Sequence, residues 1–469
     1  MSVCLMDQRR TREWKAEEAF SRLAGPRPPK RPLPFFKYLR VSRDNFIAGL
    51  HESAFSEPLY ERKFLWFRSF VVNHPDGVKR VLLDNSANYV KADILRPILG
   101  PALGVGLVTS DGETWRGLRK LISPAFDPRS VEGYAPVITT ATAEMLQRWS
   151  KLPIGTVVDV HRAMSALTLE IISRAVFADS SEMVDIIERS STEYQTKMTF
   201  SFWSVVPFLN CIWATYKTRQ GRRIVRELDE AIYRLIARRL CDSGKKSTED
   251  LLGRLVAARD SESGAGLSSQ GVRDQVVTIM MAGHETTASA LGWIWYLLSQ
   301  HPSEERKLHQ ELDHVLRGRT PTFEDIPNLP YTRMIIQEGM RLYPPVHTLS
   351  WRQAAADDYV CGKHIPKGSI VWVMPWVLHR NPTLWDNPER FDPTRFSPER
   401  SAGRSRFAYL PFSTGPRVCV GGTLAMTEAV LIVAMVAQSY RLRLVDKPPE
   451  PQGLVTLRPR YGVRMSLER

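Results

Sequence analysis

Cysteine is scarce in this chain of 469 residues, and the few cysteines show neither paired spacing nor the spacing of a zinc finger. They are Cys4, Cys211, Cys241, Cys361 and Cys419. This usage excludes a disulfide framework and is typical of a reducing compartment. The chain also lacks any run of about eighteen apolar residues, which a membrane-spanning helix would need. Because no apolar stretch follows the basic N-terminal residues, we expect no signal peptide and a cytoplasmic location.

Acidic residues are also in deficit, since 50 Asp and Glu stand against 64 Lys and Arg, for a formal net charge of +14. A basic surface can serve solubility alone, or it can form a docking face for an acidic partner, and the sequence leaves both alternatives open. No recognised nucleic-acid-binding motif accompanies the charge, so we expect no nucleic-acid partner.

The chain is 43% hydrophobic and has no low-complexity tract beyond a short proline-rich segment, so it can bury a large core. We expect a charged, proline-rich arm over residues 1–34 and a single domain over residues 35–469. Helical patterns dominate, and strand patterns are confined to residues 59–73, 359–365 and 369–374, with a hairpin tip at 454–457. These patterns predict a mainly α fold with a minor β region.

Residues 410–422 form a loop rich in glycine and proline that carries a single cysteine, Cys419, and leads into an apolar helical run over 423–439. A buried lone cysteine is more often an inert small hydrophobe than a ligand. A helix N-terminus or a bound metal would instead hold this thiol as thiolate. Gly415 and Gly421 would let a flat ligand approach the backbone, and Arg417 is placed to reach an anionic group.

The complete pattern Phe412-x-x-Gly415-x-Arg417-x-Cys419-x-Gly421 resembles the haem-binding loop of the cytochrome P-450 family. In that family a cysteine thiolate is the axial ligand of haem iron. The resemblance implies that Cys419 binds the iron of haem b and that the other residues of the pattern contact the cofactor.

A long helix is predicted over residues 268–299, and its middle carries the sequence Ala282-Gly283-His284-Glu285-Thr286-Thr287. This is a poor choice for a buried helix, but a threonine hydroxyl that captures a backbone carbonyl can open a groove. The segment resembles the oxygen-binding motif of the family. The resemblance implies that Ala282 and Gly283 leave room for O2, that Thr286 bonds the bound oxygen, and that Glu285 relays protons. We interpret His284 as structural, because a second axial imidazole would block oxygen.

Two further motifs extend the resemblance. Trp115 and Arg119 are four residues apart, so on a helix they share a face that suits a carboxylate, although such pairs are usually core and surface. By resemblance they bind a haem propionate, as does Arg352. Glu338 and Arg341 form a helix pair that is commonplace on surfaces. By resemblance they join Arg390 in a buried triad that fixes the cysteine loop without taking part in the chemistry.

An apolar loop is predicted over residues 94–107, and by resemblance it contacts the substrate together with residues 346–350 and the hairpin tip. The predicted pocket residues are Ile94, Leu95, Leu99, Leu103, Val346, Leu349 and Leu454. A pocket lined by these apolar residues favours a lipophilic substrate such as a fatty acid, terpenoid or steroid. A second apolar segment, 200–216, either roofs the pocket, belongs to the core or touches a membrane surface.

The four motifs occur in the family's order, so the chain is identified as a soluble, bacterial-type member with haem between the long helix and the cysteine loop. The resemblance implies a monomeric monooxygenase that uses O2 and a separate ferredoxin or flavodoxin to hydroxylate a C–H bond. A peroxide-driven hydroxylase, a haem-thiolate isomerase and a haem carrier or sensor are the alternatives. The intact Glu-Thr pair disfavours the first two, and the apolar access loop disfavours the third.

Overall fold

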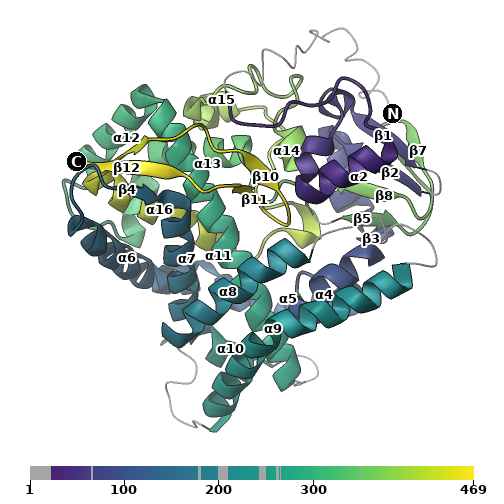
Figure 1. Cartoon of the computed structure of the whole chain (residues 1–469), viewed down its shortest axis with the longest axis horizontal. Helices are drawn as coiled ribbons and strands as arrows, with labels where there is room; N and C mark the ends of the chain where they lie inside the picture. Colours follow the sequence, from purple (N-terminus) through teal and green to yellow (C-terminus); the bar gives the residue numbers. More distant parts are fainter. Residues whose placement is uncertain are drawn as a thin grey trace.

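A computed structural model describes residues 23–64, 67–177, 181–198, 210–241, 250–259, 264, 266–349 and 351–469 of the chain. The fold is mainly helical with a minor β content, as predicted (Figure 1). The α-helices are α2(Phe35–Asp44), α3(Pro75–Lys79), α4(Arg96–Leu103), α5(Gly112–Ile122), α6(Pro128–Ser150), α7(Val160–Phe177), α8(Ser181–Lys197), α9(Asn210–Cys241), α10(Leu251–Ala257), α11(Ser269–Gln300), α12(Pro302–Val315), α13(Pro330–Leu342), α14(Pro375–Leu378), α15(Pro398–Ser401) and α16(Gly422–Ser439). The strands are β1(Leu59–Phe64), β2(Phe67–Val72), β3(Tyr89–Lys91), β4(Val157–Asp159), β5(Arg352–Ala354), β6(Asp358–Val360), β7(Lys363–Ile365), β8(Ile370–Val373), β9(Arg441–Leu444), β10(Pro451–Gly453), β11(Leu457–Pro459) and β12(Arg464–Glu468).

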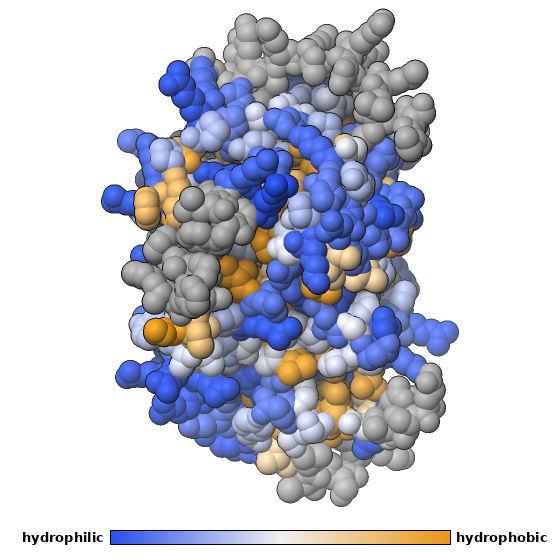
Figure 2. All heavy atoms as spheres, turned by 90° about the vertical axis from the view of Figure 1, so that its right-hand side faces the viewer, coloured by the Kyte–Doolittle hydropathy of each residue, from blue (hydrophilic) through white to orange (hydrophobic). Residues whose placement is uncertain are grey.

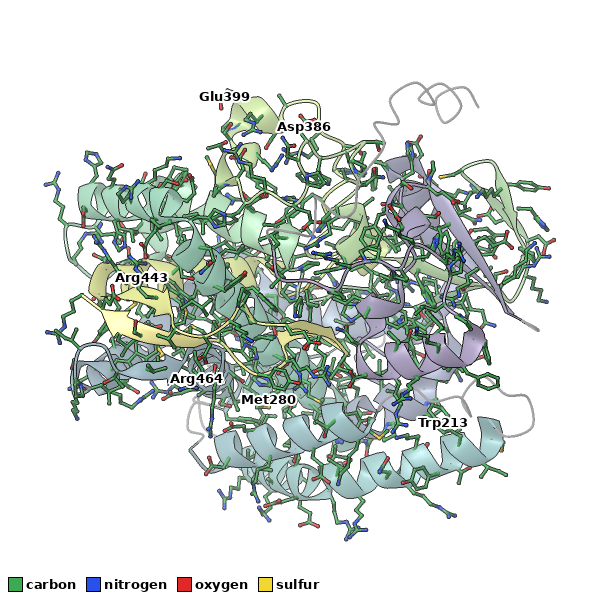
Figure 3. The ribbon with its side chains drawn as sticks, turned by 45° about the horizontal axis from the view of Figure 1, so that its top comes forward. Trp213, Met280, Asp386, Glu399, Arg443 and Arg464 are labelled. Atoms are coloured by element: carbon green, nitrogen blue, oxygen red, sulfur yellow. The ribbon has the colours of Figure 1, made fainter. Side chains whose placement is uncertain are left out.

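Helix α11 runs through the middle of the molecule and packs most extensively against α7 (Figure 1). Its first turn is capped by Ser268, whose Oγ accepts a hydrogen bond from the Gly271 amide at 3.0 Å. Its C-terminal half is buried on all sides, and Leu291 and Trp293 are fully buried. A helix that is apolar all round belongs in a core, and Figure 3 shows Met280 of α11 in the interior of the fold.

The β region is built mainly on a five-stranded sheet in the order β1-β2-β8-β5-β3. Strands β1 and β2 pair antiparallel, which confirms the two strands predicted within 59–73. The predicted hairpin tip also forms, because β10 and β11 pair antiparallel on either side of it. A three-stranded sheet, β4-β12-β9, lies at the far end of the molecule, where Figure 3 labels Arg443 on the outer strand β9 and Arg464 at the start of the central strand β12.

Residues 94–107, predicted as a loop, are largely helical, because α4 occupies Arg96–Leu103. Pro97 lies in the first turn of α4, where an amide hydrogen would have no acceptor within the helix, so proline costs no hydrogen bond there. Ile98 and Ala102 lie on the inner face of this short helix and are buried. Their burial overrides the helix-breaking tendency of Pro101, which was the basis of the loop prediction.

The molecular face over α2, β1 and β2 is mostly hydrophilic, with apolar side chains visible in small separate groups (Figure 2). Within the part of the chain that the structure describes, one helix, α16, is long and apolar enough to cross a membrane. Two thirds of it (67%) is buried inside the fold, which is the behaviour of a core helix. Most of the apolar segment 200–216 and the first 22 residues lie outside the described residues, so the roles predicted for them stay predictions.

Candidate active site

The loop before α16 is a tight turn that presents Cys419. A short 3-10 turn, Gly415–Arg417, precedes it, and the Cys419 amide donates to the Phe412 carbonyl at 2.9 Å. Gly415 has φ +69°, and a Cβ there would collide with the carbonyl oxygen of Leu82. Both the backbone conformation and the close approach therefore require glycine at this position.

The Cys419 side chain is accessible, in a loop whose other residues are mostly half-buried. Burial raises the pKa of the Cys419 thiol, and the Gly421 amide and the Arg119 guanidinium oppose that effect only in part. A thiolate at this place therefore needs a further positive charge, and a bound metal cation supplies one.

Cationic side chains gather beside this loop. The Arg417 guanidinium lies 4.0 Å from the centre of the Trp115 ring, pairs with Asp111 and donates to the Ser110 carbonyl at 3.0 Å. Arg119 donates to the Val418 carbonyl at 2.7 Å. Helix α5 thus contacts Arg417 and Val418 of the loop, and the structure brings Trp115, Arg119 and Arg417 together beside Cys419.

Lys91 is a member of this cluster that the sequence interpretation missed. It lies directly opposite Arg352 in the β3–β5 register, so two cations face the site from neighbouring strands. Burial, reinforced by Arg417, lowers the pKa of Lys91 to about 7. Asp111 is the carboxylate that opposes Lys91, Arg352 and Arg417. Two arginines and a partly protonated lysine around one carboxylate leave net positive charge for an anionic ligand.

The oxygen-side motif lies on α11, which runs unbroken through it. Thr286 Oγ1 donates to the Ala282 carbonyl at 2.7 Å, which is the capture that the sequence predicted. Thr287 does the same to Gly283 at 3.0 Å. Ala282 is exposed and Thr286 half-exposed, whereas the helix residues around them are mostly buried. These two positions are therefore accessible, as Cys419 is.

The acid of the motif is bonded to the hairpin tip. Glu285 is buried, and its Oε1 accepts from the Thr456 hydroxyl at 3.1 Å. His284 is also buried, and its Nε2 lies 3.8 Å from the Glu285 carboxylate. Burial lowers the pKa of His284, which favours the neutral ring. This placement agrees with a structural role for His284.

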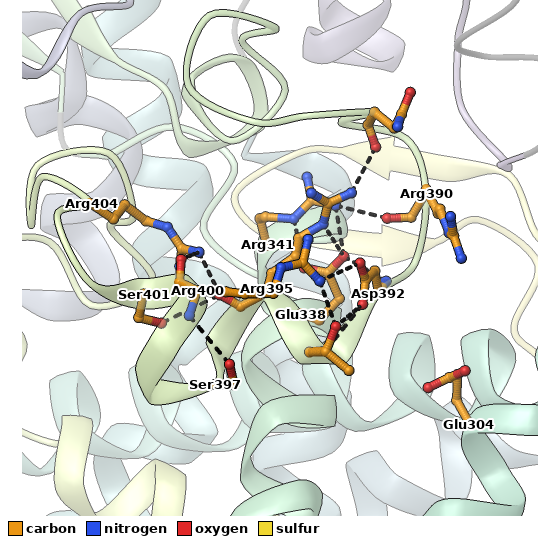
Figure 4. Close-up of polar contacts among 12 residues, drawn as sticks. Glu304, Glu338, Arg341, Arg390, Asp392, Arg395, Ser397, Arg400, Ser401 and Arg404 are labelled. Atoms are coloured by element: carbon orange, nitrogen blue, oxygen red, sulfur yellow. Dashed lines mark hydrogen bonds and ion pairs between the residues drawn. The ribbon is translucent and has the colours of Figure 1, made fainter.

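Behind the cysteine loop, a buried pair of opposite charges holds the scaffold together (Figure 4). Glu338 and Arg341 of α13 are fully buried and make two hydrogen bonds, at 2.7 and 2.8 Å. Arg341 also donates to the carbonyls of His379, at 2.8 Å, and Pro388, at 2.7 Å. A charge pair this deep is tolerated because its remaining donors are satisfied by backbone oxygens.

The third side chain of this group is Arg395, and the prediction of Arg390 is wrong. The Arg395 Nε lies 3.3 Å from Glu338 Oε1, and Arg395 is buried. Arg390 is exposed and contributes its carbonyl oxygen, which accepts from Arg341 at 3.2 Å. Both arginines stand in similar Pro-x-Arg-Phe sequences, and local sequence does not tell which one turns inward.

His379 connects this group to the cysteine loop, and the sequence interpretation missed it. Its carbonyl accepts from Arg341, and its ring Nε2 accepts from the Leu410 amide at 2.9 Å. Burial, with Arg341 and Arg380 nearby, holds the pKa of His379 well below its usual value, so the ring is a neutral acceptor. His379 therefore links Arg341 of α13 to Leu410, the first residue of the cysteine loop.

A cavity of about 560 Å³ opens beside the cation cluster. Of the predicted pocket residues, Leu95, Leu99 and Leu454 line it. Ile94, Leu103, Val346 and Leu349 do not; Leu349 is buried in the packing around the five-stranded sheet. Ile98, His347 and Thr348, which lie within the predicted segments 94–107 and 346–350, also line it, and the lining residues that were missed include Phe46, Met198 and Trp351. Phe46 and Met198 come from distant segments, which no local pattern could assign to the cavity.

These groups fit a flat, dianionic iron macrocycle. The Cys419 thiol is accessible and suits iron as a ligand. Cationic side chains beside it can pair with two carboxylates, and the small residue Ala282 is accessible on α11. Among the described residues no cluster of three His, Cys, Asp or Glu side chains offers an alternative metal site.

Comparison with known proteins finds relatives over most of the chain. The family model described as Cytochrome P450 matches residues 26–465. Cyclooctatin synthase of Streptomyces melanosporofaciens is 36% identical over 82% of this chain and 84% of its own length. Leukotriene-B4 omega-hydroxylase 3 of Mus musculus is 32% identical over 94% and 89%. The crystal structure of the cytochrome P450DA heme domain superposes with a TM-score of 0.77 at 25% identity, covering 95% of this chain and 98% of that one.

The fold and site therefore define a haem-thiolate enzyme of the monooxygenase class. The chain belongs to the cytochrome P450 family.

The buried charge group gives a matched test. We expect Arg395→Met to lower the free energy of unfolding by about 3 kcal/mol, because it leaves Glu338 with less compensation in the core. Arg390→Met should change it by no more than about 0.5 kcal/mol, since that side chain is in solvent. Thermal unfolding of the two variants checks this, and equal losses would contradict the assignment of Arg395.

Proposed function

We propose that this P450 hydroxylates a lipophilic small molecule, with haem b bound through Cys419 and electrons from a separate ferredoxin or flavodoxin. One atom of O2 enters a substrate C–H bond and the other leaves as water, which consumes two electrons and two protons. The observation that carries the proposal is the accessible Cys419 thiol in a loop that buried charges hold in place. When bound, a thiolate-ligated haem supplies the oxygen activation, because thiolate donation favours O–O cleavage.

The chain's own residues would hold the cofactor and keep it oriented. Cys419 would ligate the iron, while Phe412 and Gly421 would flank it in the loop. The cations Lys91, Arg352 and Arg417 surround the space in which carboxylates of the cofactor would bind, and the Arg417 guanidinium packs over the Trp115 ring. Arg119 anchors the loop through Val418, so it would act on the ligand geometry.

Thr286 and Glu285 would deliver protons. Because the Thr286 hydroxyl donates to the Ala282 carbonyl, its lone pairs are left to accept a hydrogen bond from a group beside the helix. Glu285 would resupply protons, with Thr456 holding its carboxylate in place. Ala282 and Gly283 carry small side chains or none, which leaves space for O2 beside the helix.

An electron donor would approach from the side of the cysteine loop. Val418 is 40% exposed, so this part of the loop reaches the surface. Helix α5 lies against it and carries Arg116 and Lys120 at exposed positions. An acidic ferredoxin or flavodoxin suits this basic face by charge complementarity.

The substrate class rests on the cavity and on the relatives. Its lining is mainly apolar, which suits a lipophilic molecule. The relatives include a cyclooctatin synthase, a cyclooctat-9-en-7-ol 5-monooxygenase and a leukotriene-B4 omega-hydroxylase. We propose a terpenoid, fatty acid or steroid substrate, a monomeric enzyme and a cytoplasmic location. Peroxide-driven turnover and haem carriage are less well supported, since neither would use Glu285 and Thr286 together with a substrate cavity.

Replacing the ligand tests the cofactor assignment. Cys419→Ala should abolish the strongly red-shifted absorption of the reduced carbon monoxide complex, because that band requires a thiolate bound to the iron. Cys211→Ser, at another exposed cysteine, should leave the band intact. The measurement is a difference spectrum of purified protein, and persistence of the band in Cys419→Ala would overturn the proposal.

The proton-delivery role is tested by two threonines on one helix. Thr286→Val should lower product formed per electron several-fold while hydrogen peroxide rises, because the accessible hydroxyl is lost. Thr287→Val removes the same type of helix bond from a buried position and should keep the coupling of the wild type. Oxygen uptake, peroxide and product are measured in parallel; unchanged coupling in Thr286→Val would count against this role.

The docking face makes a salt-dependent prediction. Lys120→Glu should raise the KM for a reduced acidic ferredoxin about threefold or more at low ionic strength, with a smaller effect as salt screens the charges. Lys63→Glu, on the exposed side of β1, is the control. Equal kinetics of both variants with the donor would place the docking face elsewhere.

A further inference from the structure

An imidazole and a hydroxyl, those of the adjacent residues His347 and Thr348, lie in the lining of the proposed substrate cavity, most of which is apolar. His347 and Thr348 are 3% and 8% exposed, and both contribute to the lining. They lie in the segment between α13 and β5, which is fixed on both sides. The Leu457 amide donates to the Pro345 carbonyl at 2.8 Å, and the Leu349 amide donates to Val373 at 2.9 Å. The two side chains therefore occupy set positions.

His347 is held from several directions. Its Nε2 is 2.8 Å from the Leu454 carbonyl oxygen, and the Phe46 ring lies 5.9 Å away between centroids. A Cβ on Gly453 would lie 3.3 Å from the same Nε2, so the hairpin tip closes tightly over the ring. A ring confined in this way has one orientation available.

The hydrogen-bond directions follow from the partners. The Leu454 carbonyl can only accept, so His347 Nε2 carries a proton. Burial lowers the pKa of His347 to about 4, so near neutral pH the other nitrogen, Nδ1, is a bare acceptor. Thr348 Oγ1 is 2.9 Å from Nδ1, and its hydroxyl must donate there.

Thr348 is left as an acceptor. Its single hydrogen is used on His347, and no donor among the described residues bonds to Oγ1, whose lone pairs remain. The other lining hydroxyls lie on other elements, and two of them also donate their hydrogen to a carbonyl. Thr109 and Ser110 donate to carbonyls of the turn after α4, at 2.7 and 2.8 Å, and Thr114 is exposed. Ser42 is packed against Gly49.

We infer that Thr348, oriented by His347, is a specificity-determining acceptor that selects a lipophilic substrate carrying a hydroxyl group. This rests on the proposed function and narrows its substrate class from lipophilic molecules in general to lipophilic alcohols. A hydroxyl can donate to Thr348 Oγ1, whereas a ketone cannot and a hydrocarbon has no polar group. A site built to bond a substrate hydroxyl discriminates against the analogue that lacks it.

Three probes of one carbon skeleton test the inference: cyclododecanol, cyclododecanone and cyclododecane. Each is titrated into the holoenzyme, and binding is followed by the change in haem spin state and by calorimetry. We expect the alcohol to bind about three- to tenfold more tightly than the ketone, as one net hydrogen bond allows. In Thr348→Val the alcohol should lose this advantage, and in Thr348→Ser it should keep it. Thr114→Val, the same change at another threonine of the lining, should bind as the wild type does.

The orienting histidine gives a second, directional test. In His347→Phe the Thr348 hydroxyl no longer has an imidazole acceptor and can donate into the cavity. The ketone should then bind as tightly as the alcohol or more tightly, a reversal that a merely structural histidine would not produce. Thermal unfolding confirms that each variant is folded before its titration.

The outcomes separate this inference from the proposed function. Wild-type protein without the red-shifted carbon monoxide band would overturn the proposed function. A normal band with equal binding of all three probes, or with an alcohol preference that survives Thr348→Val, would overturn the role of Thr348 alone. Loss of the preference in Thr348→Val together with its reversal in His347→Phe would support it.

Discussion

The structure depends on a pair of opposite charges with no exposure to solvent. Glu338 and Arg341 are stable at the centre of the thiolate side because every strong donor of the guanidinium meets an oxygen, either of the carboxylate or of the backbone. Those backbone oxygens belong to segments far along the chain. The pair therefore acts as a fixed point onto which residues 379–395 are folded, and through the His379 ring it sets the start of the cysteine loop.

Much of this architecture is predictable from sequence because its signals are local. The loop pattern around Cys419, the long helix with its Ala-Gly-x-Glu-Thr-Thr segment and the Glu338–Arg341 pair are each contiguous, and the structure has each element where it was predicted. Thr286 even makes the carbonyl bond that its position in a helix suggested. Contiguous motifs carry their own geometry, since helical spacing decides which side chains share a face.

What could not be predicted depends on pairing between distant segments. Arg390 and Arg395 stand in near-identical local sequences, and only the fold of residues 379–396 decides which side chain is buried. Lys91 joins the site because strand β3 pairs with β5 in one particular register. The helix α4 forms within a segment rich in glycine and proline, since buried contacts of Ile98 and Ala102 outweigh intrinsic propensity. Each of these features depends on tertiary contacts, which the local sequence does not specify.

The crowding of Lys91, Arg352 and Arg417 around Asp111 has a thermodynamic consequence. These like charges repel one another where they are partly buried, and this repulsion lowers the stability of the folded chain. An anionic molecule that binds only the folded chain removes this repulsion and adds its own binding free energy to the stability of the whole. Cofactor capture and maturation of the protein are thus coupled by mass action, at the corner where the five-stranded sheet meets the start of helix α5.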